Sequence, residues 1–445
     1  MGRLFGTDGI RGVANVDLTP TLAYDLGRAV GHLLNGNGNG DSVVIGQDTR
    51  RSGDMLVAGL AAGLTSMGCD VVELGVVTTP CLVFVAANGP HVAGIMVSAS
   101  HNPADDNGLK VVSGGRKVDD EAEERLERLI FQAEALPGRS NAQLGRVRRD
   151  IAEVEGYRAH LREAAGDAVR GLRIGLDCAN GSASAVAPAL FAELGAEVTV
   201  IAAEPNGTNI NDDCGSTHPE HLQRLVVERG LDLGLAFDGD ADRLIAIDER
   251  GELVDGDGVM GICALHRLES GDLRNGILVA TVMSNGGLER AITAAGGRMI
   301  RTPVGDRHVF EAMERSGAVL GGEQSGHIIF RDRASTGDGI LTGIELIKTL
   351  RASGGATLAQ LAARIPRLPQ VVINSAVRHK DQWQLDPEFT AAIARATARL
   401  GDRGRILVRP SGTEPKVRIM VEGDAQTEID EIAGELDQLA QARLN

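Results

Sequence analysis

A pattern of strand, glycine-containing turn, helix and second strand occurs three times along the chain, and this pattern constrains the fold most. First strands with their turns are expected at 43–50, 172–181 and 277–287, helices at 55–67, 182–194 and 288–295, and second strands at 70–75, 196–201 and 298–302. The helical parts carry apolar residues at three- and four-residue spacing, whereas the strands are short apolar runs. Such units place neighbouring strands parallel in one sheet. The sequence therefore predicts three related α/β domains in tandem, with mixed, mainly parallel sheets.

The C-terminal region does not repeat this pattern. It has apolar runs typical of strands at 371–377, 404–410 and 416–423, and helical periodicity at 389–400 and near the C-terminus. This arrangement predicts a smaller α+β domain. Polar, turn-rich segments at 134–147, 248–258 and 364–370 are typical of junctions between domains. We therefore predict four domains, at 1–150, 151–252, 253–367 and 368–445.

Charge and cysteine usage exclude several classes of protein. The formal net charge is −16, which argues against a nucleic-acid-binding protein and against docking on an anionic membrane surface. No apolar run reaches the ~18 residues typical of a membrane span, and the N-terminal sequence lacks the apolar core of a signal peptide. The five cysteines are odd in number and show no CxxC spacing. These features predict a reduced, cytoplasmic protein that would meet an anionic substrate in a local basic pocket.

Each predicted domain contains one apolar run that ends in a loop rich in glycine and polar residues. The four segments are 94-GIMVSASHNP-103, 233-LGLAFDGDADR-243, 318-AVLGGEQSGH-327 and 406-ILVRPSGTEPKVR-418. Ligands of α/β proteins bind at the carboxyl ends of strands. We therefore expect the four loops to converge on a central cleft. The first loop holds two serines, Ser98 and Ser100, and spacing alone does not choose between them.

The second loop carries three carboxylates at alternate positions, Asp238, Asp240 and Asp242. Hard oxygen ligands of this kind favour Mg²⁺ or Ca²⁺. Glu249 matches the twelfth position of an EF-hand, but Arg243 stands where that motif needs glycine, and a strand precedes the loop instead of a helix. A solvated acidic turn is the simpler alternative. The arginine directly after the carboxylates favours an anion beside a metal, as in phosphoryl transfer.

The fourth and third loops suit a phosphate and a sugar. In the fourth, Arg409 and Arg418 flank a Ser-Gly-Thr sequence, and arginine forks fit phosphate oxygens in bidentate geometry. In the third, Glu323 and Ser325 lie between glycines and suit vicinal hydroxyls. Either loop alone is also compatible with an ordinary turn. Together with the metal loop they indicate transfer of a phosphate between two positions of one sugar, through a nucleophile of the enzyme.

The chain resembles the α-D-phosphohexomutase family. The resemblance rests on five motifs in order, namely 6-GTDGIRG-12, SASHNP with Lys110, DGDADR, GEQSGH and RPSGTEPKVR, and it covers essentially the whole chain. It implies three related α/β domains and a smaller C-terminal domain around a central cleft, which agrees with the repeat. It also implies a phosphorylated serine, one Mg²⁺ per active site and a homodimer.

The resemblance assigns roles to individual residues. Ser100 corresponds to the phosphorylated nucleophile and fourth metal ligand beside Asp238, Asp240 and Asp242. Lys110 corresponds to a general acid/base, and we expect neighbouring cations to lower its pKa; simple phosphate binding is the alternative. The residues expected beside the transferred phosphoryl group are Arg11, His101 and Arg243; His101 could equally hold the serine loop by a structural hydrogen bond. The expected substrate contacts are Glu323, Ser325, His308, Arg409, Ser411, Gly412, Thr413 and Arg418.

Two loops bear on the substrate. Gln324 and the segment 304-VGDRHV-309 resemble the branch of the family that interconverts glucosamine 6-phosphate and glucosamine 1-phosphate, which leads to UDP-N-acetylglucosamine and the cell wall. His308 departs from this pattern, because tyrosine is more usual there. A mutase for glucose or mannose phosphates is the nearest alternative. A non-catalytic sugar-phosphate sensor would lack some of these residues, and a serine hydrolase would need the G-x-S-x-G motif, which is absent.

Overall fold

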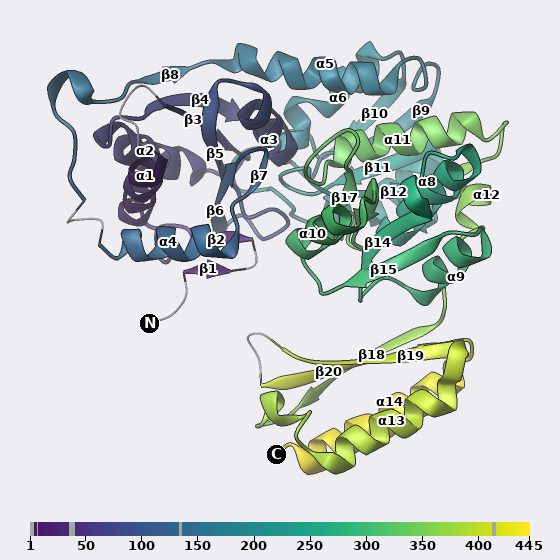
Figure 1. Ribbon diagram of the computed structural model, residues 1–445. Helices are drawn as coiled ribbons and strands as arrows, with labels where there is room; N and C mark the ends of the chain where they lie inside the picture. Colours follow the sequence, from purple (N-terminus) through teal and green to yellow (C-terminus); the bar gives the residue numbers. More distant parts are fainter. Residues whose placement is uncertain (1–3, 7, 35–40, 133–135, 412–414) are drawn as a thin grey trace.

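The computed structural model describes residues 4–6, 8–34, 41–132, 136–411 and 415–445, which form four lobes (Figure 1). We name these lobes domains I to IV after the sequence ranges given above, and the exact boundaries stay predictions. Domain I lies beside domains II and III, and domain IV projects below them (Figure 1). Of the helices in the described residues, none is long and apolar enough to cross a membrane.

Domain I is built on a mixed sheet with the strand order β1-β2-β6-β5-β3-β4-β8, and β7 pairs with β6. Strands β5, β3, β4 and β8 run parallel, whereas β1, β2, β6 and β7 are added in antiparallel pairs. The elements are β1 Phe5–Gly6, β2 Gly9–Val13, α1 Pro20–Leu34, β3 Ser42–Gln47, α2 Gly53–Ser66, β4 Asp70–Val76, α3 Thr79–Asn88, β5 His91–Val97, β6 Asp106–Ser113, β7 Arg116–Lys117, α4 Asp120–Ile130 and β8 Val147–Arg149. Val43 and Ile45 face one core and Val44 the other, so both faces of the sheet are covered.

Domain II has the strand order β10-β9-β11-β12-β13, with β10, β9 and β11 parallel and the others antiparallel. Its elements, with the last strand coming from the start of the next domain, are α5 Val154–Ala165, β9 Arg173–Asp177, α6 Ala187–Glu193, β10 Glu197–Ile201, α7 Glu220–Arg229, β11 Leu233–Phe237, β12 Leu244–Ile247 and β13 Leu253–Val254. The helix expected at 182–194 is interrupted: a 3-10 turn at Ser182–Ala185 precedes α6. Pro188 explains the break, because proline is accepted in the first turn of a helix but not in its interior.

Domain III has the strand order β15-β14-β16-β17, in which β15, β14 and β16 are parallel and β17 is antiparallel. Its elements are α8 Gly256–Ser270, β14 Ile277–Thr281, α9 Gly286–Ala294, β15 Arg298–Thr302, α10 Asp306–Ser316, β16 Leu320–Gly322, β17 Ile328–Phe330, α11 Gly339–Ala352 and α12 Leu358–Ala362. The three predicted strand-turn-helix-strand units are thus present, each within a mixed sheet. One continuous apolar core contains side chains of all three domains, for example Val44, Leu235 and Leu320.

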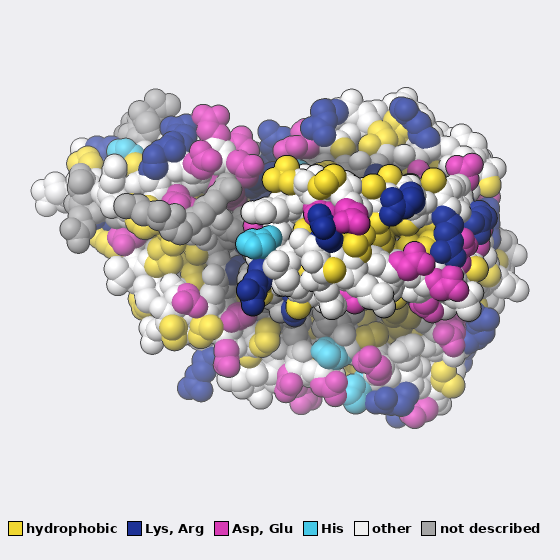
Figure 2. Space-filling view, turned by 90° about the horizontal axis from the view of Figure 1, so that it is seen from below, with side chains coloured by type: hydrophobic (Ala, Val, Ile, Leu, Met, Phe, Trp, Pro, Cys, Tyr) yellow, Lys and Arg dark blue, Asp and Glu magenta, His cyan; other side chains and the backbone are white. Residues whose placement is uncertain are grey.

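Domain IV is a three-stranded antiparallel sheet of order β18-β20-β19, with α13 and α14 packed on it (Figure 1). Its elements are β18 Gln370–Ala376, α13 Pro387–Leu400, β19 Gly404–Pro410, β20 Lys416–Gly423 and α14 Gln426–Arg443. Its buried apolar side chains, such as Phe389, Ile419 and Ile432, form a core of their own. Seen from the side of domain IV, acidic and basic side chains are interspersed over the surface (Figure 2). The predicted small α+β domain is therefore present, and it is packed separately from the other three.

Candidate active site

Strand ends of domains I, II and III bring three of the predicted loops together. Ser98 follows β5, Asp238 follows β11 and Glu323 follows β16. The second and third loops are joined by backbone: Leu244 N donates to Gly326 O at 3.0 Å. The three loops border one pocket of about 380 Å³. Its walls consist of Leu4, Gly6, Asp8, Gly9, Arg11, His101, Lys117, Asp242, Arg243, Val304, Gly305, Asp306, Glu323 and His327.

The two serines of the first loop have different surroundings. Ser100 Oγ donates to Asp238 Oδ2 at 2.5 Å and lies 3.3 Å from His101 Nδ1. Ser98 Oγ instead donates to Asp48 Oδ2 at 2.6 Å and accepts the backbone N–H of Ser100 at 3.0 Å. Ser100 has φ +53°, a left-handed conformation that is unfavourable for a residue with a Cβ and that the surroundings must hold. Ser100 therefore faces the carboxylates, and Ser98 supports the loop.

Two residues that the sequence did not single out hold the serine loop in place. The buried guanidinium of Arg50 pairs with Asp48 and donates to four backbone carbonyls of the segment 100–106. From domain II, Asn211 Nδ2 donates to Ser100 O at 2.9 Å and to Asn102 O at 3.0 Å. Both residues bind backbone carbonyls that are far away along the chain, so no local sequence pattern indicates these contacts. The only local signal is the polar segment 46-GQDTR-50, at the end of an apolar strand.

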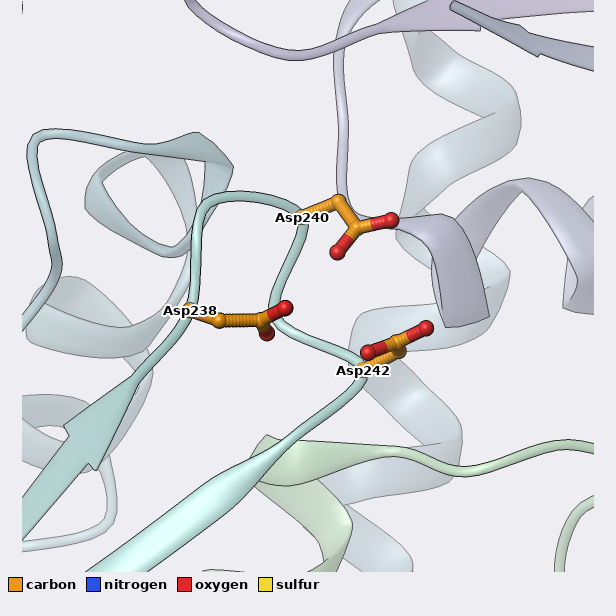
Figure 3. Close-up of side chains that lie close together, drawn as sticks. All are labelled: Asp238, Asp240 and Asp242. Atoms are coloured by element: carbon orange, nitrogen blue, oxygen red, sulfur yellow. The ribbon is translucent and has the colours of Figure 1, made fainter. Parts of the chain in front are cut away.

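The three aspartates after β11 point toward a common centre (Figure 3). They are buried, and one oxygen of each lies within 4.8 Å of the others. Asp240 Oδ1 and Asp242 Oδ1 are buried and accept no hydrogen bond from the described part of the chain. Burial first, then the charges of Asp242 and Asp240, raise the pKa of Asp238 well above its ordinary value. Buried carboxylates with unsatisfied oxygens could therefore hold a divalent cation of the kind that prefers oxygen ligands.

Lys110 is fully buried on β6, and its environment differs from the expected one. Its Nζ lies 2.8 Å from Asp240 Oδ2 and 3.0 Å from Asp8 Oδ2. Burial favours the neutral amine, but the two carboxylates outweigh it, so the pKa of Lys110 is raised. The expectation of a lowered pKa was therefore wrong, because carboxylates rather than cations are its nearest neighbours. The same contact, after the opposing effect of burial, lowers the pKa of Asp240.

The remaining residues expected at the reacting end surround Ser100. Arg11 donates to Ala99 O at 3.1 Å and to Asn102 Oδ1 at 3.2 Å, and it pairs with Asp8. Burial and the nearby Arg243 and Arg11 lower the pKa of His101 to about 4, so its imidazole is neutral at neutral pH. Arg243, His101 and Arg11 all line the pocket, and their place beside a transferred phosphoryl group stays a prediction.

Only one of the three residues expected to bind the sugar lies at the pocket. Glu323 lines the pocket, and its Oε1 accepts the backbone N–H of Gly305 at 2.9 Å. Ser325 and His308 are exposed and do not line this pocket. Several residues without an assigned role do line it, among them Lys117, Asp306 and His327. Two of these three lie within segments already noted in the sequence, 304–309 and 322–327, but charge alone did not indicate their contacts.

The described ends of the fourth loop lie apart from this pocket. Of the domain IV residues that the structure describes, none lines it. Arg409 on β19 and Arg418 on β20 are directly opposite each other, and Arg418 Nε is buried with no hydrogen-bond partner among the residues that the structure describes. Burial and Arg418 lower the pKa of Arg409. Two cations at one cross-strand position repel each other and suit an anion between them. Ser411 is buried nearby, whereas the predicted contacts Gly412 and Thr413 lie outside the described residues.

Comparisons with known protein families agree on one assignment along the chain. The α/β/α domains I, II and III of phosphoglucomutase/phosphomannomutase match residues 2–136, 155–251 and 255–368, and the C-terminal domain matches residues 372–439. The relatives include a phosphoglucosamine mutase of Moorella thermoacetica, 52% identical over 99% of both chains. Another, from Carboxydothermus hydrogenoformans, is 50% identical over 99% of this chain and 100% of the relative.

Solved structures share the fold. A phosphoglucomutase/phosphomannomutase family protein of Burkholderia thailandensis is 28% identical, with a TM-score of 0.84 over 99% of this chain and 97% of the other. An Aspergillus fumigatus N-acetylphosphoglucosamine mutase, solved with GlcNAc-6P and magnesium, has a TM-score of 0.71 at 19% identity over 99% and 96% of the two chains. At that identity the second likeness concerns the fold alone.

Proposed function

The chain belongs to the phosphoglucomutase/phosphomannomutase family, and on this premise we propose that it interconverts glucosamine 6-phosphate and glucosamine 1-phosphate. The relatives that are about half identical over the full length are phosphoglucosamine mutases. The observation that carries the proposal is the hydrogen bond from Ser100 Oγ to Asp238, within a cluster of three buried carboxylates. This arrangement supports a serine that carries a phosphoryl group beside a divalent cation. The product would enter the synthesis of UDP-N-acetylglucosamine and the cell wall.

The reaction uses Ser100 twice. In the first transfer the bond between phosphorus and Ser100 Oγ breaks, a bond to the free hydroxyl of the sugar phosphate forms, and the hydroxyl gives up its proton. The resulting sugar 1,6-bisphosphate turns around in the pocket. In the second transfer Ser100 Oγ takes the other phosphoryl group, and the freed sugar oxygen regains a proton. The phosphoserine is thus restored, and the two sugar phosphates differ only in the position of the phosphate.

The chain's own residues supply charge and geometry. Asp238, Asp240, Asp242 and Ser100 would hold Mg²⁺, which neutralises negative charge on the transferred group when bound. Arg11 and Arg243 border the same end of the pocket and suit the equatorial oxygens of that group. The proposed acid/base role of Lys110 competes with a second role, neutralisation of phosphate charge, which its raised pKa favours. His101, neutral and 3.3 Å from Ser100 Oγ, is placed to orient the nucleophile.

Substrate binding is divided between two domains in this proposal. Glu323, with Ser325 and His308 from the same side, would contact the sugar hydroxyls. Arg409, Ser411, Gly412, Thr413 and Arg418 would grip the phosphate that is not transferred. The arginine pair Arg409 and Arg418 supports an anion site, and domain IV would bring it to the pocket by turning toward domains I to III.

Cytoplasmic location and a homodimer are also part of the proposal. The five cysteines are buried and unpaired, which suits a reducing compartment. The family resemblance favours two subunits, and sedimentation of the purified protein measures this directly.

An assay with several sugar phosphates tests the proposed reaction. Glucosamine 1-phosphate, glucose 1-phosphate and mannose 1-phosphate are supplied in turn with Mg²⁺ and a trace of the matching bisphosphate. We expect the amino sugar to give the highest kcat/KM. A faster reaction with glucose or mannose 1-phosphate would instead assign the chain to the glucose/mannose branch. Intact-mass measurement should show a fraction of the protein that is heavier by one phosphoryl group.

A further inference from the structure

Five side chains of alternating charge form a continuous row, and three of them, Asp8, Lys117 and Asp306, line the pocket. Lys110 Nζ lies 2.8 Å from Asp240 and 3.0 Å from Asp8, and Lys117 Nζ in turn contacts Asp8 and, at 2.6 Å, Asp306. The order is therefore Asp240, Lys110, Asp8, Lys117, Asp306. Because Asp240 belongs to domain II, the next three to domain I and Asp306 to domain III, the row joins all three domains.

Asp8 is the branch point of the row, and its two carboxylate oxygens are divided. Oδ2 accepts a hydrogen bond from Arg11 and lies beside Lys110, whereas Oδ1 accepts a hydrogen bond from Lys117. Both oxygens are therefore fixed, and three cations converge on one carboxylate whose side chain is 21% exposed. A shift of Lys117 would rotate the Asp8 carboxylate and so move Lys110 and Arg11 together. Those two are the cations proposed to act at the reacting end of the substrate.

The domain III end of the row is attached to the proposed sugar contact. Asp306 is the first residue of α10, directly after Gly305. The N–H of Gly305 donates to Glu323 Oε1 at 2.9 Å, and Gly305 has φ +127°, which a residue with a side chain rarely adopts. Because Gly305 is held in this conformation and is hydrogen-bonded to Glu323, we expect Asp306 and Glu323 to move together. The position of the sugar contact is thereby linked to Lys117.

We propose that Asp8 and Lys117 are positioning residues, which set Lys110 and Arg11 at the transferred phosphoryl group according to the placement of the domain III sugar loop. Neither touches the reacting atoms in this role. A row of low-exposure ions is well suited to it, because each internal member is paired on both sides and loses much if one neighbour moves away. The proposal rests on the proposed function for its kinetic readout but not for its structural one.

Simple packing between domains I and III is the competing explanation, and the chain offers a matched control. Arg116 and Glu314 also form an ion pair between these domains, at 3.1 Å. Both side chains are exposed, and neither lines the active-site pocket. If ion pairs here only hold the domains together, loss of Arg116 should resemble loss of Lys117.

Kinetics of four single variants and one double variant test the proposal. Asp8→Asn should lower kcat about 100-fold, since misplacement of charged groups by about 1 Å has effects of this size. Lys117→Met and Asp306→Asn should each lower kcat about tenfold, with KM for glucosamine 1-phosphate changed less than about threefold. The double variant Lys117→Met/Asp306→Asn should be no slower than Lys117→Met alone, because Asp306 acts through Lys117. Arg116→Gln should match the wild type.

Several outcomes would overturn the proposal. These are multiplicative losses of kcat in the double variant, losses confined to KM, or an equal loss in Arg116→Gln. Denaturation midpoints and phosphoserine content, measured on every variant, separate positioning from unfolding and from failure to carry the phosphoryl group. If the wild type converted none of the sugar phosphates, the proposed function would fail, and the structural readout would decide this inference.

That structural readout is a crystal structure of the Lys117→Met variant. We expect the Asp8 carboxylate to rotate away from its present orientation and at least one of Lys110 and Arg11 to lose its contact with it. Unchanged contacts of Asp8 with Lys110 and Arg11 would overturn the proposal, whatever sugar the enzyme accepts.

Discussion

The reacting centre and domain IV are held in opposite ways. At the centre, side chains of domains I and II bind one another: Asp238 accepts a hydrogen bond from Ser100, Asn211 donates to the serine loop, and Arg50 donates to four of its carbonyls. Domain IV has its own core and meets domain III through polar contacts gathered on the loop 282–286 and on α9. The reacting centre is thus held by contacts between domains, whereas domain IV is attached to domain III along one side.

The attachment of domain IV is made mostly of arginines that bind backbone carbonyls. Arg405 donates to Val282 O at 2.7 Å and Ser284 O at 2.6 Å, and Arg290 donates to Arg403 O at 2.9 Å. Asn285 binds the backbone of Leu368 in the connecting segment. Polar contacts of this kind exchange with water at little net cost, so a rotation about them is expected to be easy. The difference teaches that the reacting centre is held in a fixed frame, whereas the proposed site for the second phosphate lies on a domain whose polar attachment would allow it to turn.

The largest expected effect separates the two serines of the centre. Ser100→Ala should lower kcat by at least about 10⁴-fold, because it removes the nucleophile, and should abolish the heavier mass species. Ser98→Ala should lower kcat only about tenfold but reduce the free energy of unfolding by about 1–3 kcal/mol, since Asp48 and Ser100 N–H lose a partner. Steady-state kinetics and denaturant titration measure both. Full mutase activity in Ser100→Ala would contradict the mechanism.

The next effect tests whether the centre is a fixed frame. Arg50→Lys keeps a positive charge near Asp48 but cannot reach four carbonyls as the guanidinium does, so kcat should fall about 100-fold. The matched control is Arg267→Lys, which alters a largely buried arginine of domain III that is paired with Asp332 and Glu345 and does not line the pocket. Both variants should lose comparable unfolding free energy, but only Arg50→Lys should lose kcat. Equal kcat values for the two would mean that Arg50 only stabilises the fold.

The sequence predicted the parts of the centre that follow strands and missed the parts that support them. The run 233–237 predicted both β11 and the loop that carries the aspartates, because an apolar strand must end where polar residues begin. Arg50 and Asn211 act through backbone carbonyls over separations of about 50 and about 110 residues, and such contacts leave no periodicity. The pKa of Lys110 was misjudged for a related reason: its partner Asp8 lies far away in the sequence. The separation of domain IV from the pocket has no local signal at all.

Substitutions in the arginine pair of domain IV should change KM but not the fraction of Ser100 that is phosphorylated. Arg418→Gln removes one of the two paired arginines, and KM for glucosamine 1-phosphate should rise about 10–100-fold, since a charge-assisted phosphate contact contributes about 1.5–3 kcal/mol. The phosphoserine fraction should stay at the wild-type level. Arg443→Gln, which alters an arginine of the same domain paired with Asp386, is the control and should leave KM unchanged. An unchanged KM in Arg418→Gln would remove the fourth loop from the substrate site.

The same comparison predicts a change of shape on binding. Small-angle scattering should give a smaller radius of gyration with saturating glucosamine 1,6-bisphosphate, because domain IV turns toward the pocket. Arg405→Met, which weakens the attachment at Val282 and Ser284, should broaden the distribution of shapes without substrate. Identical scattering of the wild type with and without ligand would mean that domain IV does not close.

The smallest expected effect concerns a carboxyl group at the junction of the interlocked domains. Asp338 lies before α11, accepts Leu341 N–H and Tyr157 Oη–H, and is 2% exposed. Burial raises its pKa to about 6, above the 3.8 of an ordinary aspartate. The folded state therefore binds this proton more tightly than the unfolded state, so stability from this group is full below pH ~4 and is lost as pH rises through ~6.

Asp338→Asn, which resembles the protonated form, should be the more stable protein at pH 7 by up to about 3 kcal/mol, and this advantage should vanish near pH 4. Denaturant titrations of both proteins at pH 4, 5, 6 and 7 measure the difference, and an advantage of Asp338→Asn that does not change with pH would show that ionisation of Asp338 does not strain the junction.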